Sequence, residues 1–465
     1  MTAIETDYLV VGAGAAGMAF ADTLVTESDA DVVLVDRRHR PGGHWNDAYP
    51  FVRLHQPAAF YGVNSRVLGT ATIDRFGPNA GMYERVTAAE ILDYFERVLD
   101  EQLLPSGRVR FHGMTEYVAD GSGGRRLVSR VTGGETTVRV RRKVVDATYL
   151  ETSVPATHTP SFTVDPGVRF LPVNGLVGLR DGGDGFTVIG AGKTSMDACL
   201  WLLDHGVPAD RIRWIRSRDA WCLDRANTQP LDLVGNLMDG LARDAEASAT
   251  ASDVADLFRQ LEAGGQLLRL DPEVEPTMYR CATVSRDELA ALRTIDDVVR
   301  LGRVLRIGTD RIELEHGGLP TSVGQVHVDC SADGLQRRPP RPIFEPGRIT
   351  LQQVRTCQPT FNAALLAFVE CTRDDDVEKN RLCPPNPYPD RAEDWITANL
   401  IQGRAQRAWS AEPDIAAWLE SCRLDVARGI GGHLDDPEVG AAIGRYAEFV
   451  VPAAENLERL AATLA

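Results

Sequence analysis

A glycine-rich loop between two short apolar runs near the N-terminus limits the folds open to this chain more than any other feature. Residues 7–11 read D-Y-L-V-V, residues 12–17 read G-A-G-A-A-G, and residues 31–35 read D-V-V-L-V. Short apolar runs of this kind predict buried parallel strands, and residues 18–25 between them have helical spacing. The order strand, loop, helix and strand predicts a βαβ unit of a doubly wound sheet.

Each glycine of this loop has a physical role in such a unit. Gly12 permits the tight turn, Gly14 lets a ligand approach the backbone, and Gly17 lets the helix pack closely. The helix start offers free N–H groups and a positive dipole end, which together favour a pyrophosphate. Asp36 stands 24 residues after Gly12, where a carboxylate accepts hydrogen bonds from a ribose. The predicted dinucleotide contacts are Gly12, Ala13, Gly14, Ala15, Ala16, Gly17, Asp36 and Arg37.

A second unit of the same kind starts at residue 186. An apolar strand leads into G-A-G-K-T-S at residues 190–195, a helical segment follows, and the next strand ends in R-S-R at residues 216–218. No acid stands at that strand end, and two arginines favour a 2′-phosphate, so we predict NADPH rather than NADH. A solvated surface pair is the alternative for these arginines, and Lys193 either approaches the phosphates or is exposed. The predicted contacts are Gly190, Gly192, Lys193, Thr194, Ser195, Arg216, Ser217 and Arg218.

The segment after Asp36 carries a family resemblance. Residues 40–45 read R-P-G-G-H-W, and Tyr49-Pro50, Arg53 and Tyr61 follow. This pattern resembles the flavin-containing and Baeyer–Villiger monooxygenase superfamily, whose G-G-x-W and Y-P-x-x-R segments lie near the flavin. The resemblance implies that the first unit binds FAD, although core packing is the alternative for the aromatic residues. The further contacts that it implies are Gly43, His44, Trp45, Tyr61 and, at the return crossing to the first domain, Asp333.

The resemblance also implies a reaction. NADPH would reduce FAD, O₂ would add to give a flavin hydroperoxide, and one oxygen atom would pass to N, S or C of a small organic substrate. The chain departs from the superfamily in lacking F-x-G-x-x-x-H within residues 150–185. An NAD(P)H-dependent FAD oxidoreductase without oxygen insertion remains an alternative, as does a non-catalytic flavin or nucleotide sensor.

Three residues near the expected flavin are the predicted catalytic groups. Arg53 could stabilise an anion that develops at the flavin. His55 could move protons near neutral pH, with a core histidine as the alternative. It stands where Baeyer–Villiger enzymes usually carry an Asp. Gln56 completes the set.

The predicted fold class is α/β, with two doubly wound Rossmann-like domains, the second inserted in the first, and a mainly helical C-terminal region. We expect an FAD-binding domain of residues 1–149 and 331–465. The NADPH-binding domain would span residues 150–330 and carry a helical insertion over about 231–298, which could line a substrate entrance.

The composition of the chain limits the partners and the kinds of site that we expect. The 465 residues include 50 Lys and Arg against 66 Asp and Glu, giving a net charge of −16, which disfavours nucleic acid and anionic membranes as partners. None of the eight cysteines forms a C-x-x-C pair, so we expect reduced thiols and no disulfide reductase of the related type. No metal-ligand spacing occurs. We expect a cytoplasmic enzyme that takes a small-molecule substrate and O₂, and a homodimer is compatible with the sequence.

Overall fold

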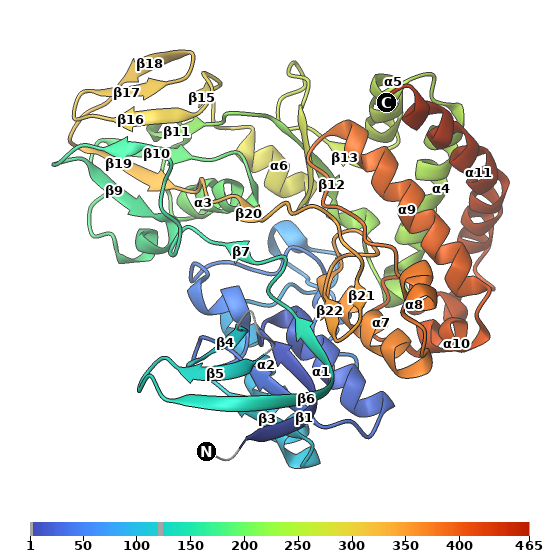
Figure 1. Ribbon diagram of the computed structural model, residues 1–465. Helices are drawn as coiled ribbons and strands as arrows, with labels where there is room; N and C mark the ends of the chain where they lie inside the picture. Colours follow the sequence, from blue (N-terminus) through green and yellow to red (C-terminus); the bar gives the residue numbers. More distant parts are fainter. Residues whose placement is uncertain (1–2, 120–123, 465) are drawn as a thin grey trace.

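The computed structural model describes residues 3–119 and 124–464, so the outermost residues of the predicted FAD domain, 1–2 and 465, lie outside it. The first sheet has parallel strands at its centre and occupies the lower part of Figure 1. An antiparallel pair, β4 and β5, extends it beside β6. Its main path runs in the order β21 (Phe344–Glu345), β22 (Arg348–Thr350), β6 (Glu135–Asp146), β1 (Ile4–Val11), β2 (Val32–Val35) and β3 (Val109–His112), with β4 at Thr115–Ala119 and β5 at Arg125–Ser129.

Helices cover this sheet because its central strands are apolar on both faces. All four residues of β2 are buried, as expected for a parallel strand inside a doubly wound domain. Helix α1 (Ala15–Glu27) packs against α7 (Pro359–Thr372), so segments from opposite ends of the sequence build one layer. Helix α2 (Ala88–Val98) begins with the capping box that Thr87 and Glu90 form.

The second sheet is wholly parallel and belongs to the second glycine-rich unit. Helix α3 (Lys193–Asp204) starts directly after the loop, and α6 (Arg286–Leu292) lies beside it. A small four-stranded sheet flanks this unit at the upper left of Figure 1. The parallel sheet runs β15 (Val298–Val299), β11 (Ile212–Ile215), β10 (Gly185–Ile189), β19 (Gln325–Asp329) and β9 (Arg169–Pro172), and the flanking sheet runs β18 (Gly317–Pro320), β17 (Arg311–Leu314), β16 (Val304–Ile307) and β8 (Thr163–Val164).

The chain passes between the two sheets through two short strands that pair with each other. Strand β7 (Thr152–Ser153) leaves the first sheet and β20 (Gly334–Leu335) returns, and the two are antiparallel. One doubly wound unit is therefore inserted in the other. This arrangement confirms the predicted fold class, since both glycine-rich loops stand between parallel strands and helices.

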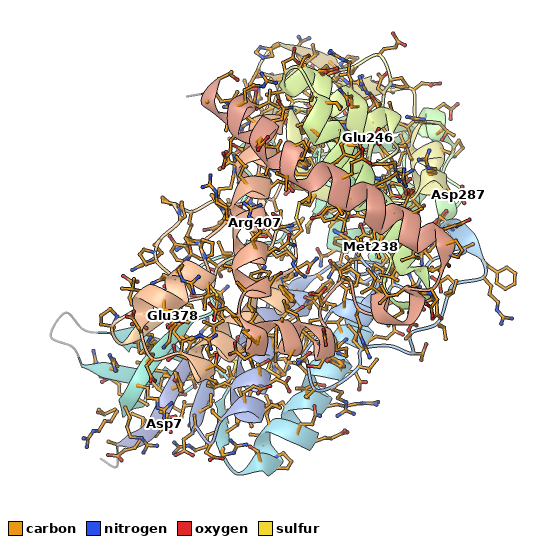
Figure 2. The ribbon with its side chains drawn as sticks, turned by 90° about the vertical axis from the view of Figure 1, so that its right-hand side faces the viewer. Asp7, Met238, Glu246, Asp287, Glu378 and Arg407 are labelled. Carbon is orange, nitrogen blue, oxygen red and sulfur yellow. A yellow bond between two sulfur atoms is a disulfide. The ribbon has the colours of Figure 1, made fainter. Side chains whose placement is uncertain are left out.

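A third, mainly helical body joins the insertion to the C-terminal region. Figure 2 shows α11 lying across α4, whose Met238 and Glu246 are labelled. The insertion is less helical than expected, because it also contains two strands, β13 (Leu267–Leu268) and β14 (Met278–Val284). Both pair with β12 (Ala220–Asp224), which precedes the insertion, in a three-stranded sheet. The helices are α4 (Val234–Thr250), α5 (Val254–Ala263), α8 (Asp376–Leu382), α9 (Ala392–Ser410), α10 (Pro413–Ser421) and α11 (Pro437–Ala462).

Two further findings concern the thiols and the membrane. A disulfide joins Cys281 to Cys357, so the expectation of uniformly reduced thiols is wrong for this pair, which folding brings together across 76 residues. In the part of the chain that the structure describes, no helix has the length and apolar character needed to cross a bilayer.

Candidate cofactor and substrate site

A cavity of about 400 Å³ lies at the carboxyl edge of the first sheet, and we call it the dinucleotide cavity. Its walls come from the first glycine-rich loop, the ends of β1, β2 and β6, and the segment around the start of α7. The sequence-predicted residues that line it are Gly12, Gly14, Ala15, Ala16, Asp36, Arg37, Gly43, His44 and Tyr61.

The helix start at this cavity is free to bind an anion. Gly14 is the N-cap of α1 and brings no side-chain cap, and the first turn holds no acidic residue, so its N–H groups remain available. A Cβ on Gly17 would lie 1.9 Å from the Gly12 carbonyl oxygen, which explains why only glycine fits there. A Cβ on Gly43 would lie 2.8 Å from the Gly14 Cα, so the G-G turn packs directly on the loop.

Asp36 lies where the sequence places a ribose-binding acid. Its Oδ2 accepts a hydrogen bond from the Ala13 N–H at 2.7 Å, and its Oδ1 accepts one from the Arg38 N–H at 2.8 Å. The carboxylate is buried yet lines the cavity, and each oxygen keeps lone pairs for a hydroxyl. Ala13 therefore contributes by holding Asp36, while Gly17 contributes by packing, and neither lines the cavity.

The far wall of the dinucleotide cavity was missed by sequence reasoning. It includes Gln352, Gln353 and Asn362, which follow β22, and Tyr388, which precedes α9. Asn362 shapes this wall: its Oδ1 accepts from the Arg355 N–H at 2.8 Å and its Nδ2 donates to the Arg355 carbonyl at 2.7 Å. A cavity with an uncapped helix start and a buried acid at the end of β2 fits FAD.

A second cavity of about 510 Å³ adjoins the first, and we call it the central cavity. Helices α4, α5 and α9 form part of its wall with apolar side chains such as Leu237, Leu261 and Trp395, and with polar ones from α4 and α9. The predicted insertion thus lines a cavity, together with the C-terminal helices. Five residues line both cavities: His44, Tyr61, Thr152, Pro359 and Tyr388.

Two predicted aromatic residues meet at this junction. The Trp45 Nε1 donates a hydrogen bond to the Tyr61 hydroxyl at 2.9 Å, and the two rings are nearly perpendicular with centroids 6.3 Å apart. Burial raises the pKa of Tyr61, so its hydroxyl stays protonated and remains a donor. Trp45 lines the central cavity only.

The three predicted catalytic residues do not lie together. His55 and Gln56 line the central cavity, but Arg53 lines neither cavity; it is exposed, and its Nη1 donates to the Arg85 carbonyl at 3.0 Å. The structure therefore does not bring Arg53 to the expected flavin. Removal from water and the neighbouring Lys193 lower the pKa of His55, which opposes the predicted proton transfer near neutral pH.

Arg225 and Asp244 are central-cavity residues that sequence reasoning missed. Arg225 has no exposed surface; its Nη2 donates to Glu288 Oε2 at 2.6 Å and its Nε to the His55 carbonyl at 3.1 Å. It thereby fixes the His55 backbone. Asp244 keeps its Oδ1 buried without a hydrogen-bond partner, and burial raises its pKa to about 7. No local motif marks either residue.

The second glycine-rich loop lies outside both cavities. Helix α3 starts uncapped at Gly192, and a Cβ there would meet nothing within 4 Å, so the loop is open to a phosphate. The Ser195 Oγ, by contrast, donates to the Gly192 carbonyl at 2.7 Å. Lys193 is buried and paired with Asp197, whose Oδ2 also accepts from the Tyr49 hydroxyl at 2.7 Å.

The two arginines that we predicted to bind a phosphate differ in burial and in their contacts. Arg216 is fully buried, its guanidinium stacks 4.6 Å from the Trp214 ring, and its nearest carboxylate contact is Asp219 at 3.6 Å. Arg218 donates to Asp390 at 2.9 Å. Neither presents a free guanidinium at the strand end. Ser217 is exposed beside them, Gly190 and Thr194 are half-buried in the loop, and Asp333 pairs with Arg280 at 2.8 Å.

Comparisons with known proteins agree with this architecture. Residues 10–62 match the family described as NAD(P)-binding Rossmann-like domain. The uncharacterized protein Rv2000 of Mycobacterium tuberculosis is 49% identical over 427 residues, covering 91% of this chain and 78% of that protein.

Solved structures share the fold at low identity. The open crystal structure of a cyclohexanone monooxygenase has a TM-score of 0.50 and 13% identity, covering 98% of each chain. The polycyclic ketone monooxygenase of Thermothelomyces thermophila has the same score and identity, covering 98% of this chain and 88% of its own. The chain therefore belongs to the family of the mycobacterial protein, and it shares its fold with these two ketone monooxygenases, in agreement with the fold that the resemblance of the G-G-x-W segment implied.

Proposed function

We propose that this protein is an FAD-dependent, NADPH-using monooxygenase that inserts one oxygen atom from O₂ into a small organic substrate. The observation that carries the proposal is that two cavities share part of their walls. The dinucleotide cavity, with its free helix start, adjoins a central cavity whose wall includes apolar side chains of α4, α5 and α9, and His44, Tyr61 and Tyr388 line both. A flavin at this junction would face a space large enough for a small substrate.

The residues of the dinucleotide cavity would hold FAD in a defined direction. The first turn of α1 would bind the pyrophosphate, Asp36 would accept from the ribose, and the wall at Thr115 and Glu116 would enclose the adenine end. When bound, FAD supplies hydride acceptance from NADPH and, with O₂, delivery of an oxygen atom.

The chain's own residues around the central cavity exclude water and fix donors. Leu237, Leu261 and Trp395 line it with apolar surface, which protects reactive species from hydrolysis. Tyr61 keeps its proton and is held by Trp45, so it is a fixed hydroxyl at the junction. His55 has a lowered pKa and would act as a neutral imidazole rather than as a cation.

NADPH would bind at the second unit, at the uncapped start of α3 beside the exposed Gly192. This second unit lies close to the segment that we expect beside the flavin. The Tyr49 hydroxyl donates to Asp197 of α3 at 2.7 Å, and the His55 Nε2 lies 3.8 Å from the same carboxylate. The choice of NADPH over NADH rests on Arg216 and Arg218, either of which must turn from its present partners to reach a 2′-phosphate.

The test begins with the visible spectrum of the purified protein. We expect bound FAD that NADPH bleaches anaerobically, and faster than NADH does. On adding O₂ with a panel of small ketones, amines and sulfides, we expect one substrate to consume O₂ without matching release of H₂O₂. If every consumed O₂ appears as H₂O₂, the chain is an oxidoreductase without oxygen insertion. A protein that takes up no FAD contradicts the whole proposal.

A further inference from the structure

The disulfide lies in the wall of the central cavity. Cys281 belongs to β14 of the insertion, and Cys357 stands one residue before the N-cap of α7. Both cysteines are only half-buried, and both line the central cavity. Of the six free cysteines, five are buried, and none lines either cavity. The bridged pair is therefore set apart from the other thiols by its position.

The backbone at both cysteines is unusual. Cys281 has a φ of 56° and Cys357 a φ of 62°, and within residues 3–119 and 124–464 only five non-glycine residues have positive φ. Such conformations cost energy and gather at functional sites. In β14 the pairing with β12 jumps from Tyr279 to Ala282, so Arg280 and Cys281 bulge out of the ladder. The chain thus departs from regular structure at both ends of the bridge.

Contacts around Cys357 connect it to the expected flavin. Its N–H donates to the Gln353 Oε1 at 2.7 Å, and Gln353 lines the dinucleotide cavity. The next residue, Gln358, lines the central cavity, and Pro359 lines both. The disulfide thus lies in the central cavity, and Cys357 is linked through its backbone to the wall of the cavity where FAD would bind.

Cys357 stands next to a helix start and near a cation in the sequence. It precedes the start of α7, a helix of 14 residues whose positive dipole end stabilises an anion. Arg355, two residues earlier, lines the same cavity and is held by Asp425 at 3.0 Å. A stabilised thiolate makes a disulfide easier to reduce.

We propose that Cys281–Cys357 is a second redox centre, which accepts electrons from the reduced flavin; this rests on the proposed binding of FAD and NADPH. The S–S bond breaks, and the two sulfurs gain two electrons and two protons. The reduced flavin supplies both electrons and is returned to its oxidised form, while its protons and solvent balance the thiols. NADPH is the ultimate reductant, and the product is a dithiol facing the central cavity.

The test counts thiols rather than turnover. The protein is treated anaerobically with NADPH, denatured, alkylated with iodoacetamide and analysed by mass spectrometry. We expect alkylation of six cysteines before NADPH and of all eight after it, the new pair being Cys281 and Cys357. An anaerobic dithionite titration should take up two more electrons per chain than FAD alone requires.

Two variants serve as controls. The double variant Cys281→Ser/Cys357→Ser should lose the extra electrons while FAD is still bleached by NADPH, and Cys371→Ser, at a half-buried free thiol, should keep them. If NADPH bleaches FAD but only six cysteines react, the bridge is a structural link and this inference fails while the proposed function stands. If FAD is bound and not bleached, both fail. The wild-type thiol count decides the matter even if the double variant does not fold.

Discussion

The two glycine-rich units have the same local fold but differ in how ready they are for a ligand. In the first, the helix start, the acid and the G-G turn all line a cavity, and Asp36 is already held by two backbone N–H groups. In the second, the helix start is open at Gly192, but Lys193 and Arg218 are paired with carboxylates and Arg216 is buried. Glycines fix the shape of a loop, whereas the long cations that complete a phosphate site can turn to other partners.

The largest expected effect is a steric clash that would occur in the first glycine-rich loop and not in the second. Gly17→Ala places a Cβ against the Gly12 carbonyl and should lower the free energy of unfolding by about 3 kcal/mol, with loss of bound FAD. Ser195→Ala, at the matching position of the second loop, removes only one hydrogen bond and should cost about 1 kcal/mol. Chemical denaturation and the flavin absorbance check both. Equal losses in the two variants would mean that the loops are equally constrained.

The next prediction concerns the acid of the first unit. Asp36→Asn replaces one accepting oxygen by an amide donor, which would face the N–H of Ala13 or Arg38. FAD binding should weaken by about 2 kcal/mol, roughly thirtyfold in Kd. Fluorescence titration of the FAD-free protein measures it. An unchanged Kd would show that Asp36 only shapes the loop.

A smaller effect, which depends on pH, is expected at Asp390, the carboxylate that accepts a hydrogen bond from Arg218. Burial raises the pKa of Asp390, but hydrogen bonds from Arg218 and Arg280 outweigh it and bring the pKa down to about 2. Because the folded pKa is below the unfolded one, these ion pairs stabilise the protein above about pH 4 and lose their effect as the pH falls through 2.

Asp390→Asn should therefore remove part of this acid sensitivity and should also hold Arg218 less firmly, since only its hydrogen bonds to neutral groups such as the Thr277 carbonyl remain, so that it can turn to a phosphate. The expected result is a KM for NADPH several-fold lower than that of the wild type, with the KM for NADH unchanged. Asp414→Asn, which removes a surface partner of Arg373, is the control that should leave both KM values alone. A variant with an unaltered KM for NADPH would place the phosphate away from Arg218.

The smallest effect on stability is expected at Arg216. Its guanidinium nitrogens have no hydrogen-bond partner, and Asp219 keeps Arg300 at 2.8 Å when Arg216 is removed. Arg216→Met should leave the free energy of unfolding within about 1 kcal/mol of wild type, because the lost ion pair is offset by relief of a buried charge. If the KM for NADPH rises while stability does not change, Arg216 turns to the phosphate on binding. If stability falls by several kcal/mol, the buried cation is structural.

Both βαβ units could be predicted from the sequence because their geometry is local: the glycines, the apolar strands and Asp36 lie within a few dozen residues. The far wall could not, because Gln353 and Tyr388 reach the cavity only through the packing of α7 and the loop before α9. Arg53 was misplaced since spacing alone does not say which way a side chain points. The partners of Arg218 and the Cys281–Cys357 bridge depend on contacts between distant segments, for which no pattern exists in the sequence.

The paired crossings at β7 and β20 have a mechanical consequence. Entry to and exit from the inserted unit lie side by side, so a rotation about these two strands would alter the span between the nicotinamide and the flavin, and the packing of α4 against α11 opposes such a rotation. The bridge from Cys281 to Cys357 is a further, covalent link between the insertion and the segment before α7, so its reduction would remove one of the restraints on this rotation.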